Sequence, residues 1–499
     1  MNITLVYRGR YLVRQALELE TLAALIRGAG HGVSLFYDPD LFGVTDNVLQ
    51  FPALARRLSS PERIARKILA RKPDAVLFSV LPATFGALSE TARLVKAKSG
   101  VPMVFLGLFP SLAAEAAMKC EAVDLVIEGE AEPALPPLLD VIAKGGFGDS
   151  ARMEAVTNLV FRRGGGLFRT EKAPPVDLDS LPPPDKNLFS PYVSQKSSYA
   201  AMVSRGCPFS CSFCEETCMK ALYGPGYFRR KSVESVMEEL LAGKRESGFK
   251  EVIFKDSYLT GDEAWLSSLM GRFKNEIGVP FKCFATITGF DDKTAQLLKQ
   301  GGCYCVEFGL QTWNAGIRKN ALNRRETNVE ARRVFEICAK VGLSYDIDHM
   351  FGLPGETGAD HRKGFEEYRK LRGVNRVKVH HLVYLPKAPI SAHAPESIAL
   401  AGAGQGGPCD FYDPASLPEN QRALVRGWAA LYKLLPLLPE GLAGRMCLRP
   451  LVPGRIPKPL MAALMGLAAL KTGDLRFLVY LKNYPALILK VLAERLGNA

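Results

Sequence analysis

Short runs of apolar, β-branched residues alternate with amphipathic, helix-length segments in the first part of the chain. Residues 14–28 carry apolar side chains at helical spacing before Gly28 and Gly30, and Ser60 followed by Pro61 is typical of a helix start. The strand-like runs are ITLVY (3–7), VSLF (33–36), AVLFS (75–79), PMVFL (102–106) and DLVIE (124–128). This alternation predicts an α/β domain over residues 1–146, an open, parallel, doubly wound (Rossmann-like) sheet.

A second alternation of the same kind starts near residue 196. Its strand-like runs are YAAMVSRG (199–206), EVIFKDS (251–257), PFKCFAT (280–286), CVEFGLQT (305–312), SYDIDHMFG (344–352) and VKVHHLVYL (377–385). Six strand and helix pairs over residues 196–390 predict a partial (β/α)6 TIM-type barrel, whose site should lie at the carboxyl ends of the strands.

Two segments carry neither pattern. Residues 147–195 hold a short hairpin-like stretch (157–170) and three consecutive prolines (182–184), which predict a linker. Residues 391–499 hold the connector AGAGQGGP (401–408) and then leucine- and alanine-rich stretches, which predict a helical C-terminal region. The run 459–470 is too short to cross a bilayer. In residues 474–496 apolar and basic residues alternate. This pattern is compatible with contact with a membrane surface, with a cover over a hydrophobic substrate or with packing on the barrel.

Composition and charge narrow the class of protein. The chain has 499 residues, 47% hydrophobic and 23% charged, as in folded proteins of two or three domains. Its start lacks a signal-peptide core, so we expect a cytoplasmic protein. The net charge of +13 is explained by basic residues that solvate helix faces or by an acidic partner. No basic run interleaved with aromatics is present, so we expect no nucleic-acid partner.

Three cysteines are crowded into the loop after the first barrel strand. The stretch SRGCPFSCSFC holds Cys207, Cys211 and Cys214 in the spacing Cys-x3-Cys-x2-Cys. A reducing compartment disfavours disulfides, so the cluster indicates metal or redox chemistry. A four-iron cube normally takes four thiolates, and three local ligands leave one iron open to another molecule. Zinc with Cys218 as a fourth ligand is the alternative, although this spacing is unusual for zinc.

This motif, with the aromatic Phe213 before its last cysteine, resembles the radical S-adenosylmethionine (SAM) superfamily. The resemblance implies that the three cysteines hold a [4Fe-4S] cluster and that SAM chelates the open iron. It also implies that reduction then releases a 5′-deoxyadenosyl radical. Three further stretches resemble the SAM-binding segments of that family: FKDSYLTG, EFGLQT and HMFGLPGET. They nominate as SAM contacts Asp256, Ser257, Glu307, Gln311, Gly352, Leu353 and Pro354.

The front domain resembles the cobalamin-binding class of the same superfamily. The segments 78–84, 105–111 and 125–139 and the proline-rich linker carry this resemblance. It implies a cobalamin near the carboxyl edge of the front sheet, with Ser79, Gly107 and Gly129 as candidate contacts. The Asp-x-His-x-x-Gly motif that supplies a cobalt ligand in some cobalamin proteins is missing. His31 is interpreted as a turn residue, and residues 37–59 as a cover for the corrin or as plain surface.

Together these features predict a radical SAM enzyme that uses cobalamin and methylates an unactivated carbon of a small, hydrophobic substrate. Two alternatives stay open: a radical cyclisation or oxidative rearrangement without methyl transfer, and a non-catalytic cobalamin- or zinc-binding scaffold. We expect a lipid, isoprenoid or tetrapyrrole as substrate and a flavodoxin or ferredoxin as electron donor. Of His380 and His381, one should face the barrel interior; Tyr304 and Tyr345 are further candidates at the barrel end.

Overall fold

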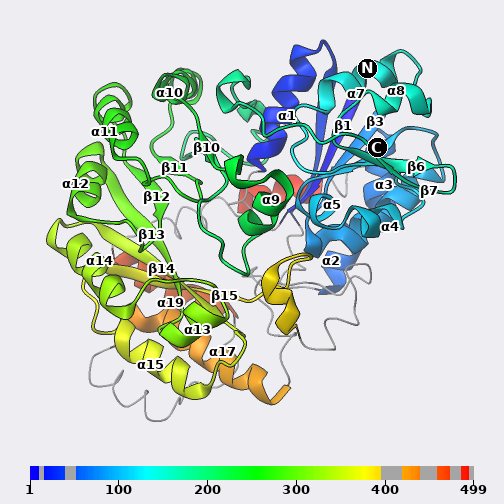
Figure 1. Ribbon diagram of the computed structural model, residues 1–499. Helices are drawn as coiled ribbons and strands as arrows, with labels where there is room; N and C mark the ends of the chain where they lie inside the picture. The colour runs from blue at the N-terminus through cyan, green and yellow to red at the C-terminus, as the bar shows by residue number, and fades with distance from the viewer. Residues whose placement is uncertain (10–15, 40–51, 395–418, 439–457, 473–484, 494–499) are drawn as a thin grey trace.

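The computed structural model describes residues 1–9, 16–39, 52–394, 419–438, 458–472 and 485–493 (Figure 1). The connector predicted at 401–408 lies outside this range. So do part of the segment 37–59 and most of the segment 474–496. Figure 1 shows an N-terminal domain in blue and cyan beside a larger domain in green and yellow, with helix α9 between them.

The front domain contains a sheet of seven strands in the order β2-β1-β3-β4-β5-β6-β7. The first five strands pair in parallel, as predicted: β1 (Asn2–Arg8), β2 (Gly32–Asp38), β3 (Ala75–Ser79), β4 (Met103–Leu106) and β5 (Leu125–Ile127). The hairpin β6 (Leu159–Arg163) and β7 (Gly166–Arg169) adds to β5 antiparallel. After a short helix, the segment predicted as a linker therefore contributes two strands to the front sheet, because Leu159 and Phe161 bury their side chains in its core.

Helices cover both faces of this sheet, which confirms the doubly wound fold. One core lies under α1 and α7 and the other under α3, α4 and α6. Ser60 caps α3 by accepting a hydrogen bond from the Arg63 amide at 3.3 Å, and Pro61 takes the first helical position. The helices are α1 (Leu17–Gly28), α2 (Pro52–Leu58), α3 (Pro61–Leu69), α4 (Phe85–Lys96), α5 (Leu108–Leu112), α6 (Ala114–Met118), α7 (Leu135–Ala143) and α8 (Ser150–Glu154).

The second domain is an open, six-stranded parallel sheet in the sequential order β8-β11-β12-β13-β14-β15, as a partial barrel requires. Its strands are β8 (Tyr199–Ala201), β11 (Val252–Phe254), β12 (Phe281–Ala285), β13 (Cys303–Gln311), β14 (Ser344–Phe351) and β15 (Val374–His381). A small antiparallel pair, β9 (Ser204–Arg205) and β10 (Arg229–Arg230), flanks the loop that follows β8. The carboxyl ends of the parallel strands therefore meet at one edge, where the cysteine loop begins.

Helices follow the strands, and most of them pack on one side of the barrel sheet around a large core; α9 (Glu215–Tyr223) and α13 (Ala315–Asn320) instead contribute Cys218 and Ile317 to a cluster at the domain interface. Side-chain caps from Asp262, Asp291 and Thr327 set the starts of three of them. The helices are α9 (Glu215–Tyr223), α10 (Val233–Ser247), α11 (Glu263–Arg272), α12 (Asp292–Gly301), α13 (Ala315–Asn320), α14 (Asn328–Lys340) and α15 (Gly358–Tyr368).

The described part of the C-terminal region is helical, as predicted. Helix α17 (Glu419–Leu434) packs on β15 and α15 and buries Trp428 and Tyr432 in the barrel core. It is followed by α19 (Lys458–Thr472) and a helix over residues 485–493. Among the described residues, no helix is both long and apolar enough to cross a bilayer.

Candidate cofactor site at the domain interface

The three cysteines lie in the loop between β9 and α9, and Cys214 stands immediately before the first residue of α9. All three are free thiols of intermediate exposure. The loop is closed locally by a hydrogen bond from the Cys214 amide to the Cys211 carbonyl at 3.1 Å and by one from the Thr217 hydroxyl to the same carbonyl at 2.7 Å. The Cys211 carbonyl is thus satisfied within the protein, and the three sulfur atoms remain as candidate metal ligands.

A second segment, which follows α13, holds this loop from the outside. The Ser212 amide donates to the Leu322 carbonyl at 3.0 Å, and the Asn323 side chain donates to the Ser210 carbonyl at 2.7 Å. The Ile390 amide donates to the Ser212 carbonyl at 3.0 Å. The position of the cysteines is therefore fixed by contacts distant in sequence, and the motif alone does not fix it.

Arg324 is the charged partner of the cysteine cluster. Its guanidinium lies 3.7 Å from the Cys211 sulfur, donates to the Gly309 carbonyl at 2.6 Å and pairs with Glu326 at 2.5 Å. Burial raises the pKa of the Cys207 thiol to about 11 and that of Cys214 well above its usual value. Burial also raises the pKa of Cys211, and Arg324 opposes this rise. Buried thiols of this kind lose their protons when a metal binds, so the donor set fits a metal cluster.

Beside Arg324 a cavity of about 260 Å³ opens at the carboxyl ends of the strands. It is lined by Lys255, Asp256, Ser257, Phe284, Ala285, Thr286, Glu307, Gly309 and Arg324. Three of the sequence-predicted SAM contacts, Asp256, Ser257 and Glu307, thus share one cavity with the arginine that contacts Cys211. Sequence reasoning did not find Arg324, because no motif marks it and its only signal is the basic pair after Asn323.

Asp256 is buried and ties the start of the cysteine loop to β11. Its Oδ1 accepts hydrogen bonds from the Val203 amide at 2.9 Å and from the Ser204 amide and hydroxyl at 2.5 and 2.6 Å. Burial raises the pKa of this carboxyl to about 6, although these hydrogen bonds oppose the rise. The neighbouring Ser257 hydroxyl donates to Glu216 at 2.7 Å. Oδ1 of Asp256 is thus used within the fold, while its Oδ2 is buried without a protein partner.

Glu307 lies between two lysines on the floor of the cavity. Lys282 and Lys378 each approach it to 2.5 Å. Burial would raise the pKa of Glu307, but Lys378 and Lys282 together hold it well below its usual value, so the group is an anion. Asp346 also pairs with Lys282, at 2.7 Å. The site therefore contains a compensated network of buried charges rather than a single acid.

Gln311 ends β13 in an unusual conformation. Its φ is +70°, and the register between β13 and β14 shifts between Gly309 and Gln311. A residue other than glycine with its backbone in the left-handed region costs about 1–3 kcal/mol, and such residues are found preferentially at functional sites. The amide oxygen of Gln311 is buried without a hydrogen-bond partner. This acceptor is available to a ligand hydroxyl, which agrees with the resemblance of EFGLQT to a SAM-binding segment.

The turn Gly352–Leu353–Pro354 follows β14 at the same edge of the barrel. The Glu356 carboxylate holds it by accepting from the Gly352 and Leu353 amides at 2.8 and 3.3 Å. Leu353 packs in an apolar cluster that also contains Phe213 and, from the front domain, Leu108 and Leu112. The two domains thus meet at an apolar surface that joins two sequence-predicted site residues.

In the front domain the structure brings Ser79, Gly107 and Gly129 to one edge. Gly107 (φ +95°) and Gly129 (φ +94°) are bridged by Ser111, whose hydroxyl donates to the Gly107 carbonyl at 2.8 Å and accepts from the Gly129 amide at 2.9 Å. A Cβ on Gly129 would lie 2.1 Å from the Tyr223 hydroxyl of α9. The close approach expected from a flat ligand at Gly129 is thus made here by a barrel tyrosine.

Other sequence-predicted residues lie elsewhere. Tyr304 and Tyr345 are second in their strands, at the amino edge of the barrel, where they bond to Glu251 and to the Arg372 carbonyl; their prediction as barrel-end site residues was wrong. His380 approaches Asp348 at 3.2 Å. His381 is buried against Phe351 on the other side of the sheet. His31 precedes β2, at the amino edge of the front sheet, so the sole histidine of residues 1–195 is placed away from the candidate cobalamin edge.

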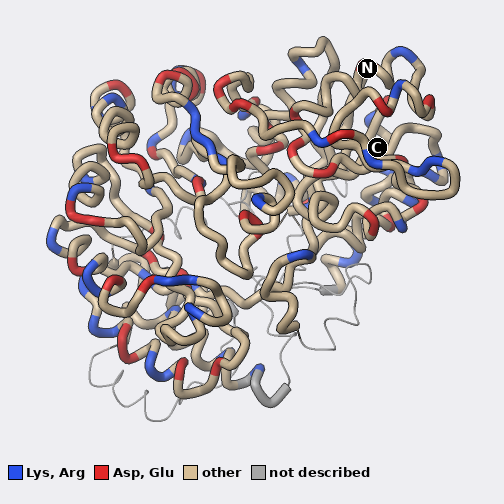
Figure 2. Tube along the Cα trace, viewed as in Figure 1, with Lys and Arg blue, Asp and Glu red and all other residues tan. Residues whose placement is uncertain are grey.

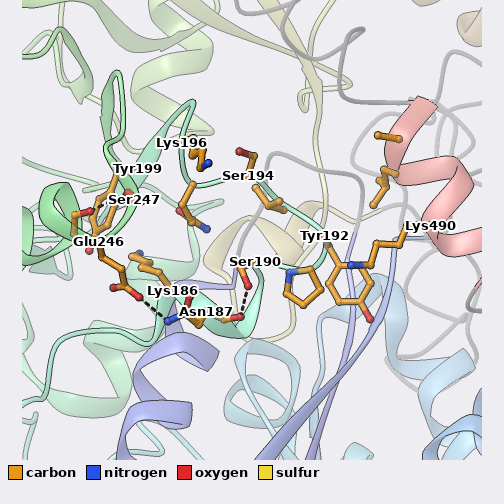
Figure 3. Close-up of a pocket in the computed structure, with 16 residues that line it drawn as sticks. Lys186, Asn187, Ser190, Tyr192, Ser194, Lys196, Tyr199, Glu246, Ser247 and Lys490 are labelled. Carbon is orange, nitrogen blue, oxygen red and sulfur yellow. Dashed lines mark hydrogen bonds between the residues drawn. The ribbon is translucent and has the colours of Figure 1, made fainter.

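A second cavity, larger than the one beside Arg324, lies away from the cysteines. It has a volume of about 450 Å³ and is lined by the linker near Tyr192, the end of α10 and the helix over 485–493 (Figure 3). Basic and acidic residues are mixed over the helices of both domains (Figure 2). The chemistry therefore centres on the edge with the cysteines, by its donor set and not by its cavity size.

Comparison with known proteins agrees with this arrangement. Residues 202–366 match the family model of the radical SAM superfamily, and residues 11–139 match that of the B12 binding domain. The uncharacterized methyltransferase PH0819 of Pyrococcus horikoshii is 27% identical over 301 residues, which cover 59% of this chain and 63% of that protein. An anaerobic magnesium-protoporphyrin IX monomethyl ester cyclase of Rubrivivax gelatinosus is 23% identical over 363 residues, covering 69% and 62%.

The chain thus spans just under two thirds of the length of these two curated relatives. Among solved structures, the radical SAM methyltransferase TsrM of Kitasatospora setae, with cobalamin and a [4Fe-4S] cluster bound, superposes with a TM-score of 0.65. That match has 16% identity and covers 97% of this chain and 99% of TsrM, so it shows a shared fold. Residues 202–366 thus form a radical SAM domain, and residues 11–139 in front of it match a B12-binding domain.

Proposed function

We propose that this protein is a cobalamin-dependent radical SAM methyltransferase that acts on a carbon atom of a small, hydrophobic molecule. One observation carries the proposal. The three cysteines share one barrel edge with the cavity of Asp256 and Glu307, and that edge faces the front sheet across α9 (Figure 1). Both family models match at the two sides of this interface.

Each residue of the site has a role under this proposal. Cys207, Cys211 and Cys214 would hold a [4Fe-4S] cluster, and Arg324 would offset the negative charge of its thiolates. Glu307, Gln311 and the turn at Leu353 would bind and orient SAM. When bound, the cluster supplies an electron that cleaves SAM, and cobalamin carries the methyl group. Ser79 and Gly107 lie at the edge that would face cobalamin, and the front-domain sequence offers no histidine to the cobalt at this edge.

The apolar interface favours a hydrophobic substrate. Leu108 and Leu112 of the front domain meet Leu353, Leu382 and Leu385 of the barrel. Most of these side chains are already buried against one another, so a lipid, an isoprenoid or a tetrapyrrole would bind beside them, and each CH₂ group that it buries would contribute about 0.8 kcal/mol. The net charge of +13 supports an acidic electron donor such as a flavodoxin or a ferredoxin. The prediction of membrane contact through residues 474–496 concerns residues that lie mostly outside the described ones.

A second candidate function is radical ring formation or oxidative rearrangement without methyl transfer. It is favoured by the relative from Rubrivivax gelatinosus, a cyclase that aligns with a larger share of this chain than the methyltransferase PH0819 does. Both candidates use the same cysteines. They differ in the fate of the SAM methyl group.

Labelled SAM separates the two candidates. The anaerobically reconstituted protein would be incubated with methyl-labelled SAM, cobalamin, a reductant and panels of lipids and tetrapyrroles, and the products analysed by mass spectrometry. Methyl transfer predicts a labelled product, whereas a product with no label supports the cyclase. The Cys214→Ala variant is the control and should form neither deoxyadenosine nor product. Deoxyadenosine formation by that variant at the parent's rate would refute the site assignment itself.

A further inference from the structure

Two histidines and a glutamate converge on the opposite side of the barrel sheet from the cysteines. His349 lies on β14, Glu356 in the turn after it, and His361 in the first turns of α15. One candidate ligand atom from each lies within 4.8 Å of the other two. The Nδ1 of His361 is 3.6 Å from Oε1 of Glu356. Side chains from a strand, a turn and a helix thus meet at one point.

These atoms are buried and lack partners. His349 is 1% exposed, and the side chains of His361 and Glu356 are 4% and 3% exposed. His349 Nε2, Glu356 Oε1 and His361 Nδ1 have no hydrogen-bond partner. An unsatisfied buried polar group costs about 1–3 kcal/mol, so three of them in one place call for a ligand.

One further polar atom of His349 and one of Glu356 are already used, and this use aims the free atoms of these two side chains at the common point. The Tyr368 hydroxyl lies 2.9 Å from Nδ1 of His349 and leaves Nε2 as the free ring nitrogen. The backbone of the turn uses Oε2 of Glu356, which leaves Oε1. A ring nitrogen fixed by a hydrogen bond on its other nitrogen is the usual arrangement of a metal-ligating histidine.

The electrostatic environment agrees with the geometry. Burial lowers the pKa of His361 to about 4 and that of His349 well below its usual value, so both imidazoles are neutral. Neutral imidazole is the form that binds metals. Aromatic rings enclose the site: the rings of His349 and Tyr432 lie 4.7 Å apart, and those of Phe351 and His361 4.9 Å apart. Burial raises the pKa of Glu356 to about 8, so this carboxyl loses its proton when the cation binds, and the low-dielectric enclosure then strengthens the cation–carboxylate contact.

We propose that His349, Glu356 and His361 form a second metal site, which binds a divalent first-row transition cation such as Zn²⁺ or Fe²⁺. Two histidines and one carboxylate are a known ligand set for both ions. Two ligands at about 2.1 Å from a tetrahedral ion lie about 3.4 Å apart. The contact between His361 and Glu356 is near that value, and His349 would close on the ion by about an ångström.

The site is separate from the cysteine cluster. Side chains alternate along a strand, so Met350 joins the interface cluster with Phe213, while His349 and Phe351 face α17. A bound cation would join β14, α15 and the turn at Leu353. It would thereby hold the turn proposed to bind SAM, but its binding does not depend on the proposed function.

Metal analysis of the holoprotein tests this inference. The cluster-reconstituted full chain would be titrated with ZnCl₂ and measured by elemental analysis, so that the three cysteines are already occupied. We expect one Zn²⁺ per chain beyond the cluster metals. Glu356→Gln keeps an oxygen for the turn amides and removes the anionic ligand, and we expect its Kd for Zn²⁺ to rise at least ~100-fold. Tyr368→Phe should raise this Kd by ~10–100-fold. His393→Ala changes an exposed histidine and should leave the Kd unchanged.

Substitution of Co²⁺ for Zn²⁺ identifies the ligands. Nitrogen and oxygen ligands predict a Co²⁺ absorption spectrum that has no thiolate-to-cobalt charge-transfer band. His361→Ala should not show this Co²⁺ spectrum at all. A thiolate band would place the ion on cysteines and overturn the inference. So would equal Zn²⁺ affinity in the parent and in Glu356→Gln, provided that circular dichroism and cluster absorbance show that both are folded.

Discussion

Arg205→Gln tests whether buried ion pairs seat the front domain against the cysteine loop. Arg205 stands two residues before Cys207 and pairs with Glu132 at 2.5 Å and with Glu130 at 3.3 Å, across the domain interface. The side chain of Arg205 is 18% exposed and that of Glu132 is 2% exposed. Glu130 keeps a second partner, Arg229, so the group left without a partner in the variant is chiefly Glu132.

The size of the effect follows from burial. Removing one partner of a buried pair costs about 3–5 kcal/mol, and we expect the lower end, about 3 kcal/mol at pH 7.5, because Arg229 stays near. Burial would raise the pKa of Glu132, but Arg205 holds it below its usual 4.5. The pair therefore stabilises the fold above pH 4.5, and this contribution is lost as the pH falls through the lowered pKa. In Arg205→Gln burial acts without this arginine and raises the pKa of Glu132, so the difference between parent and variant should begin to shrink above pH 4.5.

Urea unfolding of the reconstituted protein at pH 7.5 and pH 5, followed by tryptophan fluorescence, measures this difference. Arg27→Gln is the matched control, because Arg27 pairs with Asp185 at 2.8 Å while its own side chain is 53% exposed. We expect at most about 1 kcal/mol for this exposed pair. Equal losses in the two variants, or a loss in Arg205→Gln that does not change with pH, would refute the reasoning.

Two further predictions concern groups around the cysteines. In the parent, the rise of the Asp256 pKa from its usual 3.8 to about 6 should lower the free energy of unfolding by at most about 3 kcal/mol as the pH rises from 4 to 6. Asp256→Asn should flatten this dependence in denaturant titrations, and an unchanged slope would count against it. Arg324→Gln should slow alkylation of Cys211 in the iron-free chain, measured by peptide mass spectrometry, because burial then raises the thiol pKa without the opposing guanidinium. Arg332→Gln, an exposed change, is the control, and equal rates in the two variants would contradict the role of Arg324.

Local pattern was enough to predict most of the fold. All five strands predicted in the front domain and all six predicted in the barrel form where apolar β-branched runs occur in the sequence. A sheet that is buried on both faces requires such runs. The cap at Ser60 follows from chemistry within one turn of helix. The pairing of the hairpin at 159–169 with β5 could not be predicted in the same way, since it depends on contacts across more than thirty residues.

The candidate site was predictable where residues lie in one motif and unpredictable where the fold brings distant residues together. Cys207, Cys211 and Cys214 are evident from spacing, but Arg324 reaches Cys211 from 113 residues away. Tyr345 was misplaced because alternation shows which face a side chain takes and not which end of the strand it occupies. The sequence does show the end, since Tyr345 is the second residue of its strand-like run and therefore lies at the amino end.

Helix α9 starts directly after Cys214 and ends at Tyr223, whose hydroxyl accepts from the Glu130 amide beside Gly129. Nine residues of helix make a stiff rod of about 13 Å. The third cysteine and the front sheet are therefore mechanically coupled: a tilt of one domain relative to the other must either carry that sulfur with it or break the tyrosine contact. Insertions or deletions should consequently be tolerated in the linker long before they are tolerated in this rod.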